Sequence, residues 1–233
     1  MFAVIYIPNF HLQAALRLDP ELRTRPVALI DDHVPKATIF QLTEAAANAG
    51  VVPGLTSTQA MARCRDVIIR SRSIAQEEAA TETLLQCAYC FSPNLESTAA
   101  GICTMDLQGL SDWSADGHVR TDLAEQLHWA EKIFGALSQL GFEAQLGLAE
   151  TPSLALQAAK HATSSPFLPE GRRVSGRGGF LFVDDPNQFI SELPIESLSP
   201  PSEIFEVLKK WGIQTVGAFL ALGKDKLAER LGP

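Results

Sequence analysis

Short apolar segments typical of buried strands recur along the whole chain, separated by stretches with helical periodicity. The strand-like segments are Ala3–Ile7, Pro26–Ile30, Ala37–Gln41, Val67–Ser71, Gly101–Leu107, Glu143–Leu148 and Gly179–Val183. The helical patterns cover Phe10–Leu16, Thr43–Ala49, Ser57–Cys64, Ile74–Phe91, Arg120–Leu140 and Pro152–His161. Because strands and helices do not alternate strictly, this order predicts an α+β fold that contains at least one mixed sheet.

Capping residues support several of these helices. Thr56 or Ser57 can cap the helix that begins near residue 57, and Gly141 can close the long helix before it. Thr151 followed by Pro152 places a proline at a first helical position, where its missing N–H group costs nothing.

Bulk composition excludes some classes of protein. Hydrophobic residues make up 46% of the 233 residues, yet no apolar run approaches the roughly eighteen residues that a membrane-spanning helix needs. Four cysteines are too few for a disulfide scaffold, and the N-terminus lacks the basic segment of a secretory signal, so a reducing, cytoplasmic location is expected. The net charge of −8 argues against a surface covered in phosphate-binding groups but allows a local basic surface.

The chain contains a C-x-x-C motif, formed by Cys87 and Cys90 late in a predicted helix. A structural zinc site needs a second pair of ligands, and a redox motif normally lies at the start of a helix. Cys64 and Cys103 stand alone, and the five histidines are scattered. The pattern therefore favours small core residues over a metal or redox site.

After residue 161 the composition shifts to a linker rich in Ser, Pro, Gly and Arg. Its basic part contains Arg172, Arg173 and Arg177, which could bind phosphate, although a solvated loop is the favoured interpretation. A strand, a turn at residues 184–188 and a helical tail over roughly Pro201–Leu231 follow.

The tail LKKWGIQTVGAFLAL has the pattern of two helices joined by a tight turn. Such a helix-hairpin-helix can cradle a nucleic-acid phosphate with backbone N–H groups. The predicted DNA-binding residues are Lys209, Lys210, Gly212, Ile213, Thr215 and Gly217. A plain αα-hairpin used only for packing explains this segment equally well.

The ends of two predicted strands carry few carboxylates. Tyr6 and Pro8 close the first strand, and Gly101 and Ile102 stand five and four residues before Asp106 on the other. A site for two Mg²⁺ ions needs several oxygen ligands within a few ångströms. The sequence therefore predicts neither a metal site nor a cofactor.

Taken in order, several segments resemble Y-family DNA polymerases over essentially the whole chain. They are LRLDPELRTRPVALID, AGVVPGLTSTQAMARCRDVIIRSRS, STAAGICTMDLQGL, LGLAETPSLALQAAKHA and LPIESL followed by LKKWGIQTVGAFLALGKDKLAERLG. The resemblance implies a ferredoxin-like palm at residues 1–10 and 72–163, a small fingers subdomain at 11–71 and a helix-hairpin-helix thumb at 164–233. It also implies that the family's little-finger domain is absent from these residues.

The resemblance further implies which family contacts are missing. Metal-binding acidic residues of the family fall on Tyr6, Pro8, Gly101 and Ile102, and Asp106 alone remains. The aromatic residue that screens the sugar falls on His11. The residues that hold the triphosphate fall on Glu44, Ala47 and either Pro152 or Leu156.

This combination is similar to the ImuB type, which implies a non-catalytic adaptor in bacterial DNA damage tolerance, translesion synthesis and SOS mutagenesis. The implied partners are DNA, a sliding clamp, an error-prone replicative-type polymerase and a RecA-like protein, the protein partners mostly through regions beyond residue 233; no membrane is implied. Two alternatives remain open. One is a protein-interaction module that no longer binds DNA, and the other is an active polymerase that uses Asp31, Asp32 or Glu96.

Overall fold

The computed structural model describes residues 1–110, 114–115, 118–119, 123–162 and 178–223. The chain divides into two compact units, Met1–Phe182 and Val183–Pro233. No helix among the described residues is both long enough and apolar enough to cross a membrane.

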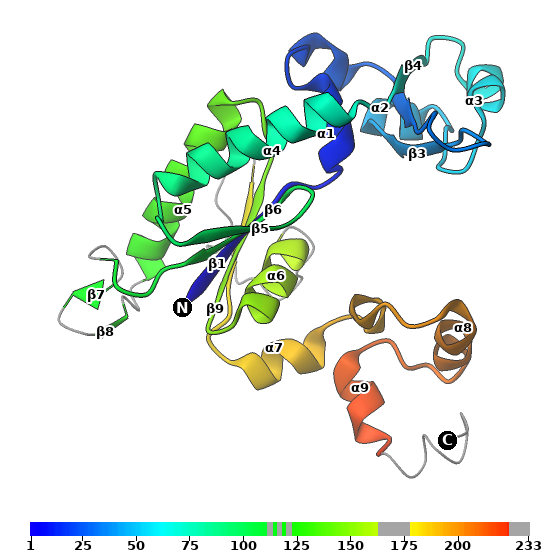
Figure 1. Ribbon diagram of the computed structural model, residues 1–233. Coiled ribbons are helices and arrows are strands. Elements are labelled where there is room, and N and C mark those ends of the chain that lie inside the picture. The colour runs from blue at the N-terminus through cyan, green and yellow to red at the C-terminus, as the bar shows by residue number, and fades with distance from the viewer. Residues whose placement is uncertain (111–113, 116–117, 120–122, 163–177, 224–233) are drawn as a thin grey trace. The chain divides into compact units, whose positions relative to one another are not determined.

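A five-stranded mixed sheet organises the first unit (Figure 1). Its order is β10 (Gly179–Phe182), β9 (Gln145–Ala149), β1 (Phe2–Tyr6), β6 (Ile102–Asp106) and β5 (Leu95–Ala99). The central strand β1 is antiparallel to both neighbours, whereas the edge strand β10 is parallel to β9. The predicted α+β class and mixed sheet are therefore confirmed.

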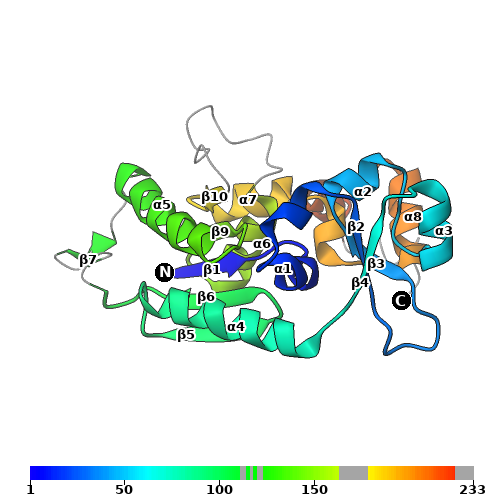
Figure 2. The ribbon, with the colours of Figure 1, turned by 90° about the horizontal axis from the view of Figure 1, so that it is seen from above.

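Helices lie on both faces of this sheet (Figure 2). Two long helices, α4 (Ile74–Tyr89) and α5 (Leu123–Gln139), share a core with Ala3 and Ile5 of β1 and with Ile7, which directly follows the strand. The helix α6 (Pro152–His161) packs against β9, β1 and β10. Alternation of side chains along β1 therefore buries one set of residues under α4 and α5 and turns the other set toward α6.

Close packing of α6 on the sheet depends on Gly147 in β9. A Cβ atom at this position would lie 2.0 Å from the carbonyl oxygen of Ala155 and 2.3 Å from the backbone nitrogen of Ala159. Both distances are far below van der Waals contact, so only glycine allows the helix to approach the strand this closely.

A second, three-stranded sheet belongs to the same unit. Its order is β3 (Ile39–Leu42), β2 (Val27–Ile30) and β4 (Ile68–Ser71), with β2 antiparallel to β3 and parallel to β4. The surrounding helices are α1 (Phe10–Leu16), η1 (Pro20–Thr24), α2 (Glu44–Asn48) and α3 (Ser57–Arg63).

A capping box between Thr56 and Gln59 begins α3, which confirms one of the two predicted caps. A short hairpin consists of β7 (Ser114–Ala115) and β8 (His118–Val119).

The second unit is helical in its described part. It contains α7 (Pro186–Glu192), η2 (Ile195–Leu198), α8 (Ser202–Lys210) and α9 (Val216–Ala221). A small core of Ile195, Leu208 and Ile213 holds these elements together. The two backbone hydrogen bonds from Ile195 N to Gln214 O, 2.9 Å, and from Val216 N to Leu193 O, 2.9 Å, tie the α8–α9 turn to the residues after α7.

The turn predicted at residues 184–188 is wrong. Asp185 accepts hydrogen bonds from the N–H groups of Asn187 and Gln188, and Pro186 occupies a first helical position, so these residues begin α7. Aspartate, proline and asparagine are common both in turns and at helix N-termini. The residues that follow, Phe189 and Ile190, belong to the helix α7. The strand β5 and the helix η1 were not predicted. The basic loop residues Arg172, Arg173 and Arg177, and the tail beyond residue 223, lie outside the described residues.

We expect Gly147→Ala to lower the free energy of unfolding by about 3 kcal/mol, at the upper end of the usual cost of overpacking, because the added methyl group overlaps backbone atoms of α6 that cannot move independently. Chemical denaturation followed by circular dichroism measures this change. Gly135→Ala is the matched control, since Gly135 lies exposed within α5 with nothing within 4 Å of an added Cβ. That variant should be neutral or more stable by about 0.5–1 kcal/mol. Equal stability of the two variants would contradict the packing argument.

Candidate functional site

The predicted site positions Tyr6 and Ile102 lie directly opposite each other on β1 and β6. On the other side of β1, Tyr6 is paired with Gln145 of β9. All three side chains are partly exposed, and the residues between them along the strands face the core. Strand pairing therefore brings together two positions, 96 residues apart, that the sequence analysis had grouped only by resemblance.

The space beside Gly101 is filled by an aromatic ring. Gly101 has a φ of +72°, and its carbonyl oxygen accepts a hydrogen bond of 2.8 Å from the N–H group of Ile7. A Cβ atom on Gly101 would lie 2.6 Å from Cβ of the buried Phe10. An acidic side chain at this position would have to displace Phe10 and adopt a backbone conformation that L-residues rarely tolerate.

The residual acidic residues do not gather around Tyr6. Asp106 pairs with Phe2, four residues further along the same strands, which corresponds to about 13 Å. Its carboxylate accepts a hydrogen bond of 2.9 Å from the N–H group of Gln108. Glu96 lies on the edge strand β5, opposite Thr104. Neither residue is placed to share a metal ion with the Tyr6–Ile102 pair.

Among the described residues, Asp31, Asp32 and His33 alone form a cluster with metal-ligand spacing. They follow β2 of the three-stranded sheet, and Asp31 is already engaged by Arg72, whose Nη1 lies 3.3 Å from its Oδ2. The backbone N–H of His33, together with Arg72, holds the pKa of Asp31 below its ordinary value. The described acidic residues therefore do not fit the paired-metal arrangement that a polymerase requires.

A network of charged side chains connects α1, α4 and the three-stranded sheet. The guanidinium group of Arg72 donates two hydrogen bonds to Glu77, from Nε at 2.7 Å and from Nη2 at 2.9 Å. Nδ1 of His11 lies 3.0 Å from the same carboxylate. Burial of Glu77 opposes its ionisation, but the interactions with Arg72 and His11 outweigh burial and lower its pKa. The sequence analysis missed this network, although Arg72 directly follows a strand and Glu77 lies in the first turn of the next helix.

His11 occupies the position that the resemblance assigns to the sugar-screening aromatic residue. Its imidazole ring makes edge-to-face contacts with Phe10 and Phe40, at ring-centre distances of 5.8 and 5.7 Å. Because its Nδ1 atom contacts Glu77 and its ring contacts Phe40, His11 connects α1 to α4 and to β3. Glu44 and Ala47, the other predicted degenerate positions, lie exposed on the short helix α2.

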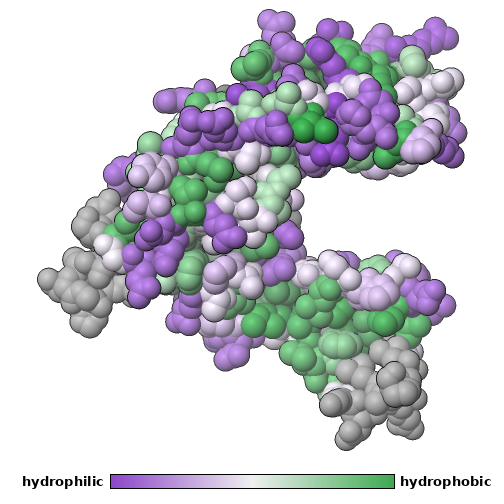
Figure 3. All heavy atoms as spheres, viewed as in Figure 1, coloured by the Kyte–Doolittle hydropathy of each residue, from purple (hydrophilic) through white to green (hydrophobic). Residues whose placement is uncertain are grey.

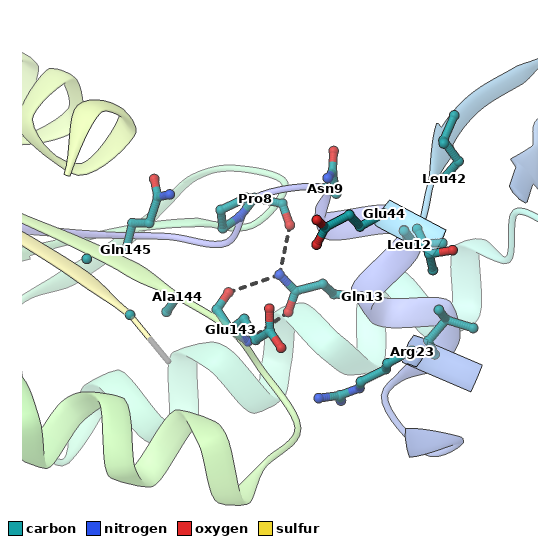
Figure 4. A pocket seen from close by; sticks show the side chains of 14 residues that line it. Pro8, Asn9, Leu12, Gln13, Arg23, Leu42, Glu44, Glu143, Ala144 and Gln145 are labelled. Atoms are coloured by element: carbon teal, nitrogen blue, oxygen red, sulfur yellow. Dashed lines mark hydrogen bonds between the residues drawn. The ribbon is translucent and has the colours of Figure 1, made fainter. Parts of the chain in front are cut away.

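A pocket of about 570 Å³ opens between α1, the start of α2 and the segment before β9 (Figure 4). Gln13 crosses it. The side-chain amide of Gln13 donates to the carbonyl oxygens of Pro8, 2.8 Å, and Glu143, 2.9 Å, and its oxygen accepts from the N–H group of Glu143, 2.8 Å. The end of β1 and the start of β9 are thereby held against α1.

The cysteines are not placed for nucleophilic chemistry. Cys87 and Cys103 are buried, and burial raises the pKa of Cys87 to about 11 and that of Cys103 to about 12. Both thiols therefore stay protonated near neutral pH. Cys90 is exposed at the end of α4, so it is not the core residue that was predicted.

The predicted DNA-binding residues lie in the second unit, at the end of α8, in the turn that follows it and at the start of α9. Lys209 and Lys210 end α8 on its exposed side, and Gly212 takes a φ of +74° in the turn. Thr215 caps α9 by accepting a hydrogen bond of 3.2 Å from the N–H group of Ala218. Ile213 is buried, and a Cβ atom on Gly217 would lie 2.8 Å from the carbonyl oxygen of Ser191.

Comparison with known proteins places this arrangement in a family. The profile described as the impB/mucB/samB family matches residues 5–160. The chain belongs to the impB/mucB/samB family. This impB/mucB/samB chain is 23% identical over 184 residues to Protein ImuB of Caulobacter vibrioides, in strains NA1000 / CB15N and ATCC 19089 / CIP 103742 / CB 15. The match covers 78% of the chain and 35% of each relative, so the chain spans about a third of the length of the curated relatives it matches.

Solved structures show the same fold for this impB/mucB/samB chain. DinB from Sulfolobus solfataricus superposes with a TM-score of 0.74 at 18% identity, covering 100% of the chain and 63% of the other protein. An insertion ternary complex of Dbh DNA polymerase gives a TM-score of 0.71 at 18% identity, covering 98% and 63%. A Y-family DNA polymerase chimera of Dbh and Dpo4 gives 0.72 at 17% identity, covering 98% and 63%. The resemblance to the Y-family polymerases is therefore confirmed.

We expect Glu77→Gln to lower the free energy of unfolding at pH 7 by roughly 1–3 kcal/mol, because it leaves Arg72 and His11 without their shared carboxylate. Folding lowers the pKa of Glu77, so the ionised carboxylate contributes its full share to the free energy of unfolding at neutral pH. This stabilisation begins to fall below about pH 4.3, the ordinary pKa of a glutamate, and is lost as the pH drops through the lower pKa of the folded state. Denaturation curves between pH 7 and pH 3 test this, and the gap between the two proteins should close at low pH. Glu78→Gln, on the exposed side of α4, is the control and should change little.

Proposed function

We propose that this chain is a non-catalytic, polymerase-like protein of bacterial DNA damage tolerance, which acts as an adaptor for DNA and protein partners. The observation that carries the proposal is the palm-like sheet whose site positions hold Tyr6, Ile102 and Gly101. Phe10 fills the space in which an acidic side chain on Gly101 would have to lie.

Phosphoryl transfer by polymerases depends on divalent ions that position the triphosphate and neutralise developing charge. The tyrosine, isoleucine and glycine at the site provide no carboxylate oxygen for such ions. Tyr6 and Ile102 are also compatible with a stable sheet, because aromatic and β-branched side chains suit strands. The residues at these positions can therefore explain both the proposed loss of catalysis and the retention of the fold.

The chain should not extend a primer in the presence of Mg²⁺ or Mn²⁺, primed template and all four deoxynucleotides. Restoring acidic residues by Tyr6→Asp, Ile102→Glu and Gly101→Asp together should not restore extension either, because an aspartate at position 101 collides with Phe10 and destabilises the palm by roughly 1–3 kcal/mol. Gel-resolved primer extension and thermal denaturation measure the two effects. Extension by the wild-type chain that is lost in Asp106→Asn would refute the proposal.

The α8–α9 hairpin is the part of the chain that we propose binds the DNA backbone. Its support is the pair of exposed lysines, Lys209 and Lys210, beside a tight turn at Gly212 that leads into the capped start of α9. Lysines next to backbone N–H groups attract phosphate without reading the base sequence. Binding of this kind is weak and falls as salt concentration rises.

Charge reversal at Lys209→Glu with Lys210→Glu should weaken binding to a fluorescent DNA duplex at least tenfold in low salt and reduce the salt dependence. Fluorescence anisotropy at several salt concentrations gives both quantities. Lys132→Glu with Lys160→Glu is the matched control, since both lysines are exposed in the first unit and the change in net charge is the same. Equal weakening by both double variants would show that net charge, and not the hairpin, controls binding.

A protein-interaction module without DNA binding is the second candidate. The second unit exposes Leu198, Ile204 and Leu220, and Figure 3 shows apolar side chains gathered over its helices. The net charge of −8 also favours protein over nucleic acid. Weak binding to DNA that ignores both the salt concentration and the two hairpin lysines would favour this candidate.

The further partners belong to the same proposal. On the resemblance to the ImuB type, we further propose contacts with a sliding clamp, an error-prone replicative-type polymerase and a RecA-like protein, and a cytoplasmic location. Because the chain spans about a third of those relatives, we assign these contacts to the full ImuB-type architecture rather than to particular residues here.

A further inference from the structure

The walls of the pocket beside Gln13 combine apolar side chains with two carboxylates. The partly exposed Pro8 and Leu42 supply the accessible apolar part, since Leu12 and Leu16 are buried. Glu44, in the first turn of α2, and Glu143, before β9, supply the acidic part, and both are exposed. Figure 4 shows their carboxylates on either side of Gln13.

Within the described residues, neither carboxylate has an ion-pair partner. Arg23 is the one described cation that lines the pocket, and its Nη2 donates a hydrogen bond to the carbonyl oxygen of Gly141. Two acidic groups that face one opening repel a polyphosphate and attract a cation. The pocket therefore has the opposite charge preference from a triphosphate site.

The three hydrogen bonds of Gln13 hold the pocket in shape before any ligand arrives. A pre-formed site does not spend binding free energy on ordering its own walls. Its mixed lining matches the chemistry of lysine and arginine, whose aliphatic stems pack on apolar surface while the charged end remains near carboxylates. Aliphatic neighbours of such a side chain would contact Pro8 and Leu42, which are partly exposed.

We propose that this pocket binds a short segment of a partner protein in which a lysine or arginine side chain is flanked by aliphatic residues. The occupant's cationic group lies between Glu44 and Glu143, and its aliphatic side chains lie against Pro8 and Leu42. This inference goes beyond the proposed function and does not require it, because primer extension and DNA binding are measured separately from peptide binding.

The probe is the acetylated and amidated peptide Gly-Leu-Lys-Leu-Gly, and the control peptide has Gln in place of Lys. Titration into the ¹⁵N-labelled 233-residue chain, followed by NMR, should shift the side-chain amide of Gln13 and the backbone amides of Glu44 and Glu143 in a saturable manner. Glu44→Gln with Glu143→Gln should weaken binding roughly threefold to tenfold, as expected for two solvent-accessible charge pairs. Glu78→Gln with Glu150→Gln removes the same charge from exposed sites elsewhere and should leave the affinity unchanged.

Four results would overturn the proposal. They are the absence of a saturable shift in the wild-type chain, an equal response to the Gln peptide, unchanged affinity in Glu44→Gln with Glu143→Gln, and displacement of the peptide by dTTP bound at the same amides. A further arm concerns the arginines that precede Gly178 in the sequence. If the peptide binds only after Arg172→Gln, Arg173→Gln and Arg177→Gln are combined, the pocket's occupant is the chain's own segment and not a partner.

Discussion

The central strand β1 is bonded along both edges, to β6 on one side and to β9 on the other. Ala3 and Ile5 on one of its faces are fully buried beneath α4 and α5, while the other face is turned toward α6. The remainder of the first unit depends on this strand, because it joins both layers of helices to one sheet. No charged residue is needed for that role, so the fold does not depend on a metal site.

Packing and hydrogen bonds occupy the positions to which the resemblance assigns the chemistry of a polymerase, and residues next to them. Phe10 lies where a side chain on Gly101 would be, Gln13 connects three backbone groups, and His11 contacts Glu77. Each of these contacts joins α1 to a different neighbour. The segment that follows β1 therefore serves as a structural junction between the five-stranded and the three-stranded sheets.

The two units present different chemistry to their surroundings. The first has an acid-lined pocket on a rigid frame, whereas the described part of the second ends α8 in two exposed lysines and exposes several large apolar side chains. Such a division suits an adaptor, which has to contact unlike partners through separate surfaces. It is consistent with membership of the impB/mucB/samB family and with likeness to Protein ImuB.

The sequence by itself determined seven of the strands and most of the longer helices, because periodicity and capping act over a few residues. Thr56, Gly141 and Thr151 lie at helix ends as expected, whereas Tyr6, Pro8, Gly101 and Ile102 were assigned as site positions only by resemblance to the Y-family polymerases. Only the tertiary structure decided that Tyr6 faces Ile102, that Glu77 holds both Arg72 and His11, and that Gln13 reaches Glu143 across 130 residues of sequence. These contacts depend on strand pairing and on the approach of helices in space, and no local pattern of residues specifies which distant side chain will complete them.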